Sequence, residues 1–441
     1  LHLLRRDHEA HRELIVDRHT RAQQAAGDVV LRQLGGRAGT VGSMVNCIVY
    51  FNTAGMLGPN HYGSALAYSC TTPDPGGTGN ITADPEFRNR AGGDYRLKYA
   101  SPCADIPGVT ALAGPTDLDG NPRLGGSTQD LGAYEIHVFY ALPGNPFAAY
   151  PHTTFFTGAS NLQEAVDAAY TGAVVLAATG VYDQGGRPAA GSLLTNRVVI
   201  EKPLEVIGVS FPTAPVIQGS GPAGDNAVRC AWLGEEVYLR NFILSNGATR
   251  TSGDPATEQS GGGAWASNEL AVVDRCWLVN NTAVGDGGGA MGGKLMNCLI
   301  RNNTAGFGGG ASFYYAPGNL INCTIVTNTA GDSGGVYGGT NVNCIVLFNQ
   351  ASTHSNHDAA TFTYSCLSPN PGGTGNMDAN PLFKSTPTND FRVHYISPCL
   401  DAGDNSVVES RGALDGRPRI SGDAVDIGAY EIGYTYADLA N

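Results

Sequence analysis

Charged side chains that could carry out chemistry are concentrated between residues 229 and 332. The basic ones are Arg229, Arg240, Arg275, Lys294 and Arg301, and the acidic ones are Asp254, Glu258, Asp274, Asp286 and Asp332. Such groups would suit two reactions on a polysaccharide. A lyase needs carboxylates that hold Ca²⁺ and an Arg or Lys that abstracts a proton, whereas a hydrolase needs paired carboxylates. No histidine lies between His152 and His354, which predicts that no histidine assists a site on this segment.

Two of the aspartates take similar positions in front of glycines. Asp286 lies in VGDGGG and Asp332 in AGDSGG, while Phe307 stands near that point in the copy between them. We interpret both as turn residues that bond to their own backbone, with weak Ca²⁺ binding as the alternative. No catalytic residue is assigned, and we expect no required cofactor.

An insertion supplies the remaining candidates. The segment NGATRTSGDPATEQSGGGAW (246–265) separates Phe242 from Cys276 by 34 residues, where the other spacings are 21–25. Loops that leave a repeat array build the walls of a groove. The predicted ligand-binding residues beside it are Arg240, Asp254, Glu258, Trp265, Arg275 and Tyr314. The aromatic rings among them would either stack on sugars or only cover an edge of the fold.

A short repeat must position these residues. Its clearest copies begin Arg275-Cys276, Asn297-Cys298, Asn322-Cys323 and Asn343-Cys344, so the cysteines lie 22, 25 and 21 residues apart. Apolar residues alternate within each copy, which indicates a short strand with every second side chain buried. A period of about 22 residues with glycine-rich turns predicts an all-β solenoid, in which each copy is one coil of a parallel β-helix.

Stacked coils explain the repeated residue types. Cys, Leu and Ile would form apolar ladders inside the coil. The asparagines of the NNTA-like segments would lie at a turn, tolerate the left-handed conformation and bond to the same amide one coil above: Asn281, Asn303, Asn328 and Asn349. The ten cysteines form no CxxC pair, which disfavours zinc. Pairing of Cys70 with Cys103 and of Cys366 with Cys399 stays open.

A longer repeat relates residues 46–135 to 343–431. DYRLKYASPC (94–103) matches DFRVHYISPC (390–399), and DLGAYE (130–135) matches DIGAYE (426–431). This predicts an atypical segment at 1–45, the end of a first module at 46–140, and a complete module at 141–441 with a closing segment at 366–431. Residues 1–45 are either a capping helix or non-native sequence. The second module opens on a short capping helix near 160–170, begun by Ser160 or Asn161. In the closing segment, Arg419 would pair with a carboxylate and lock the end of the fold.

These residues resemble a known superfamily. Over roughly 46–431 the chain is similar to the right-handed parallel β-helix, or pectin-lyase-like, superfamily. The Asn-Cys coils resemble the polymorphic outer-membrane-protein type of repeat in bacterial surface proteins. GNITADPEF (79–87), DYRLKYASPC and the DGNPR…GAYE segment (119–135) resemble the end module of the choice-of-anchor Q group of bacterial secreted proteins. The resemblance implies right-handed coils and export from a bacterium to the cell surface or the extracellular medium.

Composition narrows the classes of partner. The chain has 441 residues with 26 Lys+Arg against 39 Asp+Glu, a net charge of −13, which argues against nucleic acid. No apolar run approaches the ~20 residues of a membrane span. The favoured function is that of a rigid scaffold or adhesin-like protein that binds carbohydrate or extracellular matrix. The alternatives are a polysaccharide lyase or glycoside hydrolase acting in a groove, and a spacer of a larger surface protein without a ligand.

Overall fold

The computed structural model describes residues 43–53, 59–61, 63–90, 92–108, 116–209, 213–409 and 412–433. These residues form two compact units that divide near Val138. The prediction for residues 1–45 lies outside the described residues except at Ser43–Val45, which form strand β1. The predicted boundaries at 45/46 and 140/141 stay predictions.

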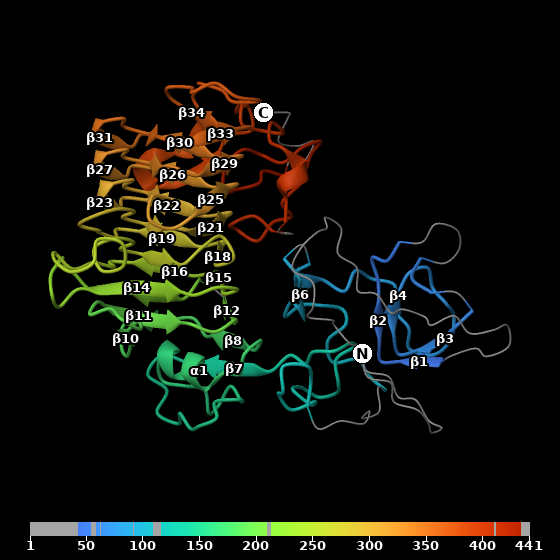
Figure 1. Cartoon of the computed structure of the whole chain (residues 1–441). Helices are drawn as coiled ribbons and strands as arrows, with labels where there is room; N and C mark the ends of the chain where they lie inside the picture. The colour runs from blue at the N-terminus through green and yellow to red at the C-terminus, as the bar shows by residue number, and fades with distance from the viewer. Residues whose placement is uncertain are drawn as a thin grey trace, which may run out of the picture. The chain divides into compact units, whose positions relative to one another are not determined.

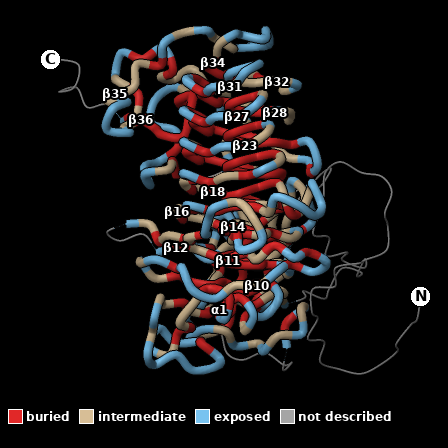
Figure 2. The backbone as a smooth tube through the Cα atoms, turned by 90° about the vertical axis from the view of Figure 1, so that its left-hand side faces the viewer, coloured by how far each residue is buried: buried red, intermediate tan, exposed pale blue. Residues whose placement is uncertain are grey.

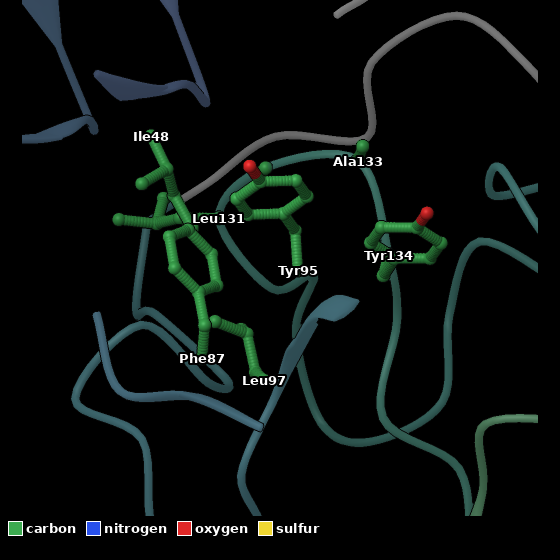
Figure 3. Close-up of a pocket in the computed structure, with 8 residues that line it drawn as sticks. Ile48, Phe87, Tyr95, Leu97, Leu131, Ala133 and Tyr134 are labelled. Atoms are coloured by element: carbon green, nitrogen blue, oxygen red, sulfur yellow. The ribbon is translucent and has the colours of Figure 1, made fainter. Parts of the chain in front are cut away.

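The first unit contains short strand pairs. β1 pairs in parallel with β3 (Ala65–Ala67), β2 (Ile48–Val49) pairs in parallel with β4 (Cys70–Thr71), and β5 (Phe87–Asn89) pairs antiparallel with β6 (Asp94–Leu97). Figure 3 shows a small apolar cavity in this unit, with a volume of about 10 Å³. It is lined by Ile48, Phe87, Tyr95, Leu97, Leu131, Gly132, Ala133 and Tyr134. A space of this size holds at most one water, so it is a packing gap and not a ligand site.

The second unit is a right-handed parallel β-helix built from three long sheets (Figure 1). Sheet A contains β10 (Arg187–Pro188), β11 (Thr195–Ile200), β14 (Val228–Leu233), β17 (Ala264–Ala266), β20 (Ala290–Met291), β24 (Ala311–Ser312), β28 (Val336–Tyr337) and β32 (His357–Asp358). Sheet B contains β7 (Val138–Ala141), β8 (Val174–Ala177), β12 (Glu205–Gly208), β15 (Tyr238–Arg240), β18 (Val272–Asp274), β21 (Gly293–Met296), β25 (Gly318–Ile321), β29 (Thr340–Val342) and β33 (Thr361–Thr363).

Sheet C contains β9 (Val181–Tyr182), β13 (Val216–Gln218), β16 (Ile243–Ser245), β19 (Trp277–Val279), β22 (Leu299–Arg301), β26 (Thr324–Val326), β30 (Ile345–Leu347) and β34 (Cys366–Leu367). A fourth, shorter sheet D joins β23 (Thr304–Phe307), β27 (Thr329–Asp332) and β31 (Gln350–Thr353). Apart from the antiparallel pairing of β10 with β11, the strand pairs whose register is defined within these four sheets are parallel. The predicted fold class is therefore confirmed.

The interior of the coils follows the sequence ladders. Cys276, Cys298, Cys323 and Cys344 are all fully buried, as are the leucines and isoleucines two residues after the first three. Figure 2 shows this buried core running through the stack of coils, with exposed residues at the turns. All ten cysteines are free thiols. The two pairings that were left open join cysteines that do lie in one buried cluster each, Cys70 with Cys103 and Cys366 with Cys399, without a disulfide.

The asparagine ladder is confirmed in its hydrogen bonds. Asn281 donates from its backbone N–H and its Nδ2 to Oδ1 of Asn303, over 2.9 and 3.0 Å. Asn303 makes the same two bonds to Asn328, and Asn328 makes them to Asn349. The predicted left-handed conformation lies one residue earlier, for example at Asn280 and Asn302, so the ladder asparagine itself is free to point inward.

A short helix covers the first coil, as predicted near 160–170. α1 (Leu162–Ala168) begins after Asn161, whose side chain accepts a hydrogen bond from the N–H of Glu164. Gln163 accepts from the N–H of Val199 and donates to its carbonyl, which satisfies the backbone of β11 on that side. In the described part of the chain, no helix is both long and apolar enough to cross a membrane.

The closing segment folds back over sheets B and C. It contains the hairpin of β35 (Phe383–Ser385) and β36 (Asp390–Val393), and 3₁₀ turns at Thr386–Thr388 and Asn405–Val407. Val407 packs on the sheet B residues Tyr238, Val272, Met296 and Ile321. The N–H of Ala429 donates to Oγ1 of Thr324 on sheet C. Parts of these two faces are therefore covered by the chain itself.

Arg419 locks the closing segment by a different contact from the predicted one. Its Nη2 donates to the backbone carbonyls of Asp426 (2.7 Å) and Gly428 (2.6 Å), so the predicted carboxylate partner is wrong. The carboxylate of Glu431 instead accepts the backbone N–H groups of Ser421 and Asp426. A buried guanidinium offers more donors than one carboxylate can accept, and carbonyls at a tight turn need donors.

These buried carboxylates predict a pH dependence of stability. Burial raises the pKa of Glu431 to about 7 and that of Asp426 to about 6. The folded state therefore holds its protons more tightly than the unfolded state, whose glutamate pKa is about 4.3. The contribution to stability is present at low pH and is lost as pH rises from about 4.5 to about 7, by roughly 3–4 kcal/mol for Glu431 alone.

We expect hydrogen-exchange protection of residues 412–433 to fall over that pH window after correction for intrinsic exchange. Glu431→Gln would reduce the dependence to the part that Asp426 contributes, because the glutamine does not titrate. Glu409→Gln, at an exposed carboxylate that pairs with Lys294, should leave it unchanged. A slope that is the same in wild type and Glu431→Gln would contradict this assignment.

Candidate functional site

Two of the predicted ligand-binding residues, Arg240 and Arg275, are held in an ion-pair network. Nη1 of Arg240 lies 2.9 Å from Oε1 of Glu205, and its Nε lies 4.0 Å from Asp274. Nε of Arg275 lies 3.3 Å from the same Asp274 carboxylate. Glu205 and Asp274 are almost fully buried, so both arginines compensate buried charges on sheet B. Their side chains are committed to the scaffold.

The two acidic candidates of the insertion, Asp254 and Glu258, also make hydrogen bonds or ion pairs that hold the loop. Oδ1 of Asp254 accepts from the N–H and the hydroxyl of Thr257, both over 2.8 Å. These bonds lower the pKa of Asp254. Glu258 accepts from the N–H of Leu193 and lies 3.5 Å from Nε of Arg250. The structure therefore assigns both residues to holding the loop.

Trp265 covers an edge of the fold, which is one of the two roles considered for it. Its ring stacks on Trp232 with centroids 3.7 Å apart and an interplanar angle of 10°. Its Nε1 donates to the carbonyl of Ala256 over 2.9 Å, so the insertion folds against the outer side of sheet A. The two tryptophans occupy matching positions in β14 and β17.

Tyr314 belongs to a group of surface rings that we call the aromatic patch, in which the first three are exposed and the last is half-buried: Phe307, Tyr314, Tyr315 and Tyr337. The ring of Tyr314 lies 4.8 Å from Tyr315 and 5.9 Å from Tyr337, and Tyr337 lies 6.0 Å from Phe307. Tyr314 is 63% exposed and Phe307 47%. Exposed aromatic side chains that gather from successive coils are a feature of ligand surfaces.

Asp286 and Asp332 flank Phe307 in one column. Parallel pairing places Asp286 beside Phe307, Phe307 beside Asp332, and Asp332 beside Thr353. The two aspartates are therefore two coils apart, about 9.6 Å at the usual strand spacing. Ligands of one ion lie much closer together. The two predicted metal ligands are thus not neighbours in the column.

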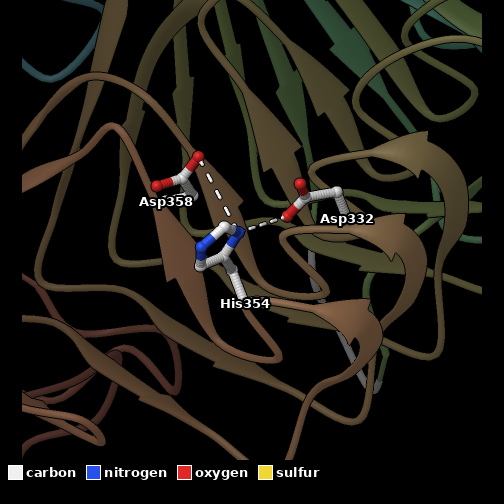
Figure 4. Close-up of side chains that lie close together, drawn as sticks. All are labelled: Asp332, His354 and Asp358. Atoms are coloured by element: carbon white, nitrogen blue, oxygen red, sulfur yellow. Dashed lines mark hydrogen bonds and ion pairs between the residues drawn. The ribbon is translucent and has the colours of Figure 1, made fainter.

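A histidine that the sequence reasoning set aside lies next to Asp332. Nδ1 of His354 is 2.8 Å from Oδ1 of Asp332 and 3.9 Å from Oδ2 of Asp358 (Figure 4). The prediction of no histidine at a site concerned the coils between His152 and His354, and stacking brings His354 from the next coil against Asp332. The signal was present in the sequence: the 21-residue spacing from Cys323 to Cys344 places Thr353 beside Asp332, and His354 is the next residue.

The environments of the two column aspartates differ. Burial raises the pKa of Asp286 to about 6, although Oδ1 accepts a hydrogen bond from Ser312. Desolvation also acts on Asp332, but hydrogen bonds from His354, Thr353 and Ser333 outweigh it and lower its pKa. At neutral pH the carboxyl of Asp332 is ionised, whereas a larger fraction of the Asp286 carboxyl groups is protonated.

Two other surface features of the second unit were considered as candidate ligand sites beside the aromatic patch. The loop between β7 and α1 exposes Phe147, Tyr150, Phe155 and Phe156. An open hollow of about 420 Å³ lies beside the closing hairpin and is lined by Phe348, Asn380, Leu382, Phe383, Thr386, His394 and Ile396. Neither lining includes a carboxylate. The aromatic patch with its flanking acids and His354 is therefore the strongest candidate site.

Comparisons with known proteins add little beyond the fold. No protein-family model matches the chain, and no curated protein matches it. Among solved structures, the chain is similar to one described as the crystal structure of pectate lyase Pel9A, with a TM-score of 0.37 and 14% sequence identity. The match covers 67% of this chain and 96% of the other. At this level of similarity it supports no argument about activity.

Proposed function

We propose that this chain is an extracellular β-helix scaffold that binds neutral polysaccharide through the aromatic patch. The observation that carries the proposal is the contact of four rings from neighbouring coils, of which three are exposed and Tyr337 is half-buried. Sugar rings present apolar C–H faces, and rigid exposed aromatic side chains bind such faces with little loss of conformational entropy. The coils supply a rigid base, since each strand of sheets A and D is paired with its neighbours.

The charge around the patch favours a neutral ligand. Burial raises the pKa of Tyr337 first, and the charges of Asp358, Tyr314, Asp286 and Asp332 raise it further. The carboxylates are therefore close enough to the ring to act on it. A polyanion such as polygalacturonate would meet these carboxylates and a chain of net charge −13. Hydroxyl groups of a neutral sugar would instead donate to the exposed carboxylate oxygens.

The test is binding of the full chain to a panel of neutral and acidic polysaccharides, measured by affinity electrophoresis and calorimetry. We expect Tyr314→Ala and Tyr337→Ala each to weaken binding of a neutral glucan, mannan or xylan about tenfold, which is about 1.4 kcal/mol. Phe156→Ala is the matched control, because Phe156 is 65% exposed and lies in the loop before α1. It should leave binding unchanged.

Two results would overturn the proposal. One is the absence of binding to every polysaccharide in the panel, which would leave a spacer without a ligand as the better description. The other is a loss of binding in Phe156→Ala with no change in the patch variants, which would move the surface to that loop.

Glycoside hydrolysis is a second candidate, favoured by the contrast between Asp286 and Asp332. Inverting glycosidases use an acid with a raised pKa and an ionised base about 6.5–9.5 Å apart. The two aspartates have these opposite shifts and stand two coils apart across Phe307. New reducing ends that form with wild type and vanish in Asp286→Asn, while binding persists, would support hydrolysis. Binding without product would support the scaffold alone.

A further inference from the structure

We propose that Asp332, His354 and Asp358 form a binding site for a divalent transition-metal ion such as Mn²⁺ or Ni²⁺. The site goes beyond the proposed function, because it would hold an ion whether or not a sugar is bound. Each residue offers one ligand atom, and these atoms all lie within 4.8 Å of one another. Among the described residues, this is the one group of three or more His, Cys, Asp and Glu side chains with that geometry.

The backbone brings the three ligands together from different elements. Asp332 ends β27 and pairs in register with Thr353, so the next residue, His354, lies over the end of the strand below. Asp358 ends β32 on sheet A, four residues later. The ligands thus come from sheet D, sheet A and the turn between them, and Figure 4 shows their side chains pointing toward one another.

A histidine is an unusual residue type at the place that His354 takes in the stack of turns. Its φ is +51°, and the stacked turn positions in the earlier coils are Gly287, Gly308 and Ser333, all of positive φ. Glycine is the residue that adopts this conformation without strain. The last coil therefore carries an imidazole where the same turn elsewhere carries a hydrogen atom or a hydroxymethyl group.

The ligand set favours a transition metal over Ca²⁺. Ca²⁺ takes six to eight oxygen ligands, whereas one imidazole with two carboxylates suits Mn²⁺, Ni²⁺ or Zn²⁺. Atoms bound to an ion at about 2.1 Å lie about 3–3.4 Å apart. The distance from His354 to Asp332 is already 2.8 Å, and that to Asp358 is 3.9 Å. A small rotation of Asp358, whose side chain is 39% exposed, would close the set.

Open coordination positions would face solvent beside the aromatic patch. The side chain of His354 is 52% exposed, and Asp358 pairs in register with Tyr337 of the patch. Water or a sugar oxygen could fill the remaining positions. An ion on Asp332 would also remove that carboxylate as a general base, so metal binding and hydrolysis by Asp286 and Asp332 are alternatives.

The experiment titrates the full, untagged chain with Mn²⁺ alone and follows the free-ion signal by electron paramagnetic resonance, with Ni²⁺ calorimetry in parallel. Zn²⁺ is avoided because ten free thiols would compete for it. We expect one ion per chain, at least tenfold weaker binding in His354→Ala, and a loss of similar size in Asp358→Asn. His357→Ala is the matched control, since this histidine lies on the same coil and bonds to the carbonyl of Pro369.

Unchanged binding in both His354→Ala and Asp358→Asn would overturn the proposal, as would no binding by wild type at millimolar ion. A loss confined to His357→Ala would place the ion elsewhere on the coil and would also overturn it. Because no sugar is present, failure here leaves the polysaccharide proposal intact. Conversely, a chain that binds Mn²⁺ but no glycan would keep this site and remove the proposed function.

Discussion

Asn303→Ala should lower the free energy of unfolding of the coil array by about 4 kcal/mol. The side chain accepts from the backbone N–H and Nδ2 of Asn281, and donates to the carbonyl of Leu278 and to Asn328. Truncation leaves the N–H of Asn281 and the carbonyl of Leu278 buried without their partners. Each such group costs about 1–3 kcal/mol. The loss should extend beyond one coil because the ladder is continuous.

Urea unfolding followed by near-ultraviolet circular dichroism would measure the effect. Thr304→Ala is the control, since Thr304 follows Asn303 directly and is exposed at the start of β23. It should cost less than about 1 kcal/mol. Asn303→Asp keeps the shape but turns the donating Nδ2 into an acceptor. If Asn303→Asp is as mild as Thr304→Ala, the ladder acts by shape and the hydrogen-bond account is wrong.

The coils could be predicted because their signals are periodic and local. Asn281, Asn303, Asn328 and Asn349 recur at the coil spacing, and a stack of coils turns such a period into direct contact. The helix at Leu162–Ala168 was readable from its capping residue for a similar reason. The backbone conformation of single turn residues was harder to predict from the sequence. It depends on which of two adjacent asparagines points its side chain inward and which adopts the left-handed conformation.

The candidate site was harder to predict because stacking, not sequence proximity, assembles it. Arg240 and Arg275 are basic residues near an insertion, yet both compensate buried carboxylates on sheet B. The sequence alone does not distinguish two arginines that neutralise buried carboxylates from two arginines that bind a substrate. His354 could be found from the sequence, because one coil period added to Asp332 leads to Thr353, the residue before it. Its contact with Asp358 required the turn between β31 and β32, whose path the repeat does not encode.

The closing segment also narrows where a ligand can bind. Parts of sheets B and C lie under residues of the segment that follows β34, such as Val407 and Ala429. The insertion covers sheet A near Trp265. The remaining open surface of sheets A and D carries the aromatic patch and the three metal-ligand candidates. The proposed sugar site and the proposed ion site therefore both lie on the side of the coils that these segments leave open.

Arg229→Met should destabilise the second unit by about 4 kcal/mol and release the insertion from sheet A. Arg229 is fully buried, and its guanidinium donates to the carbonyls of Thr257, Ser260 and Gly261 and to Oδ1 of Asn196. Burial lowers the pKa of this guanidinium to about 9, so it stays charged at neutral pH. Methionine fills the volume but leaves several acceptors without donors, each at about 1–3 kcal/mol.

Local release of the insertion would distinguish the role of Arg229 from that of an ordinary core residue. Trp265 bonds to Ala256 of the insertion, so release of the loop should expose the Trp232–Trp265 stack and shift its fluorescence to the red. Hydrogen exchange of residues 250–261 should rise before the coils unfold. Arg250→Met is the matched control, because Arg250 lies in the insertion itself, is more exposed than Arg229 and pairs with Asp225 and Glu258. It should cost about 1 kcal/mol. Equal effects of the two variants, or an Arg229→Met loop that stays protected, would show that the insertion is held by packing and not by this buried cation.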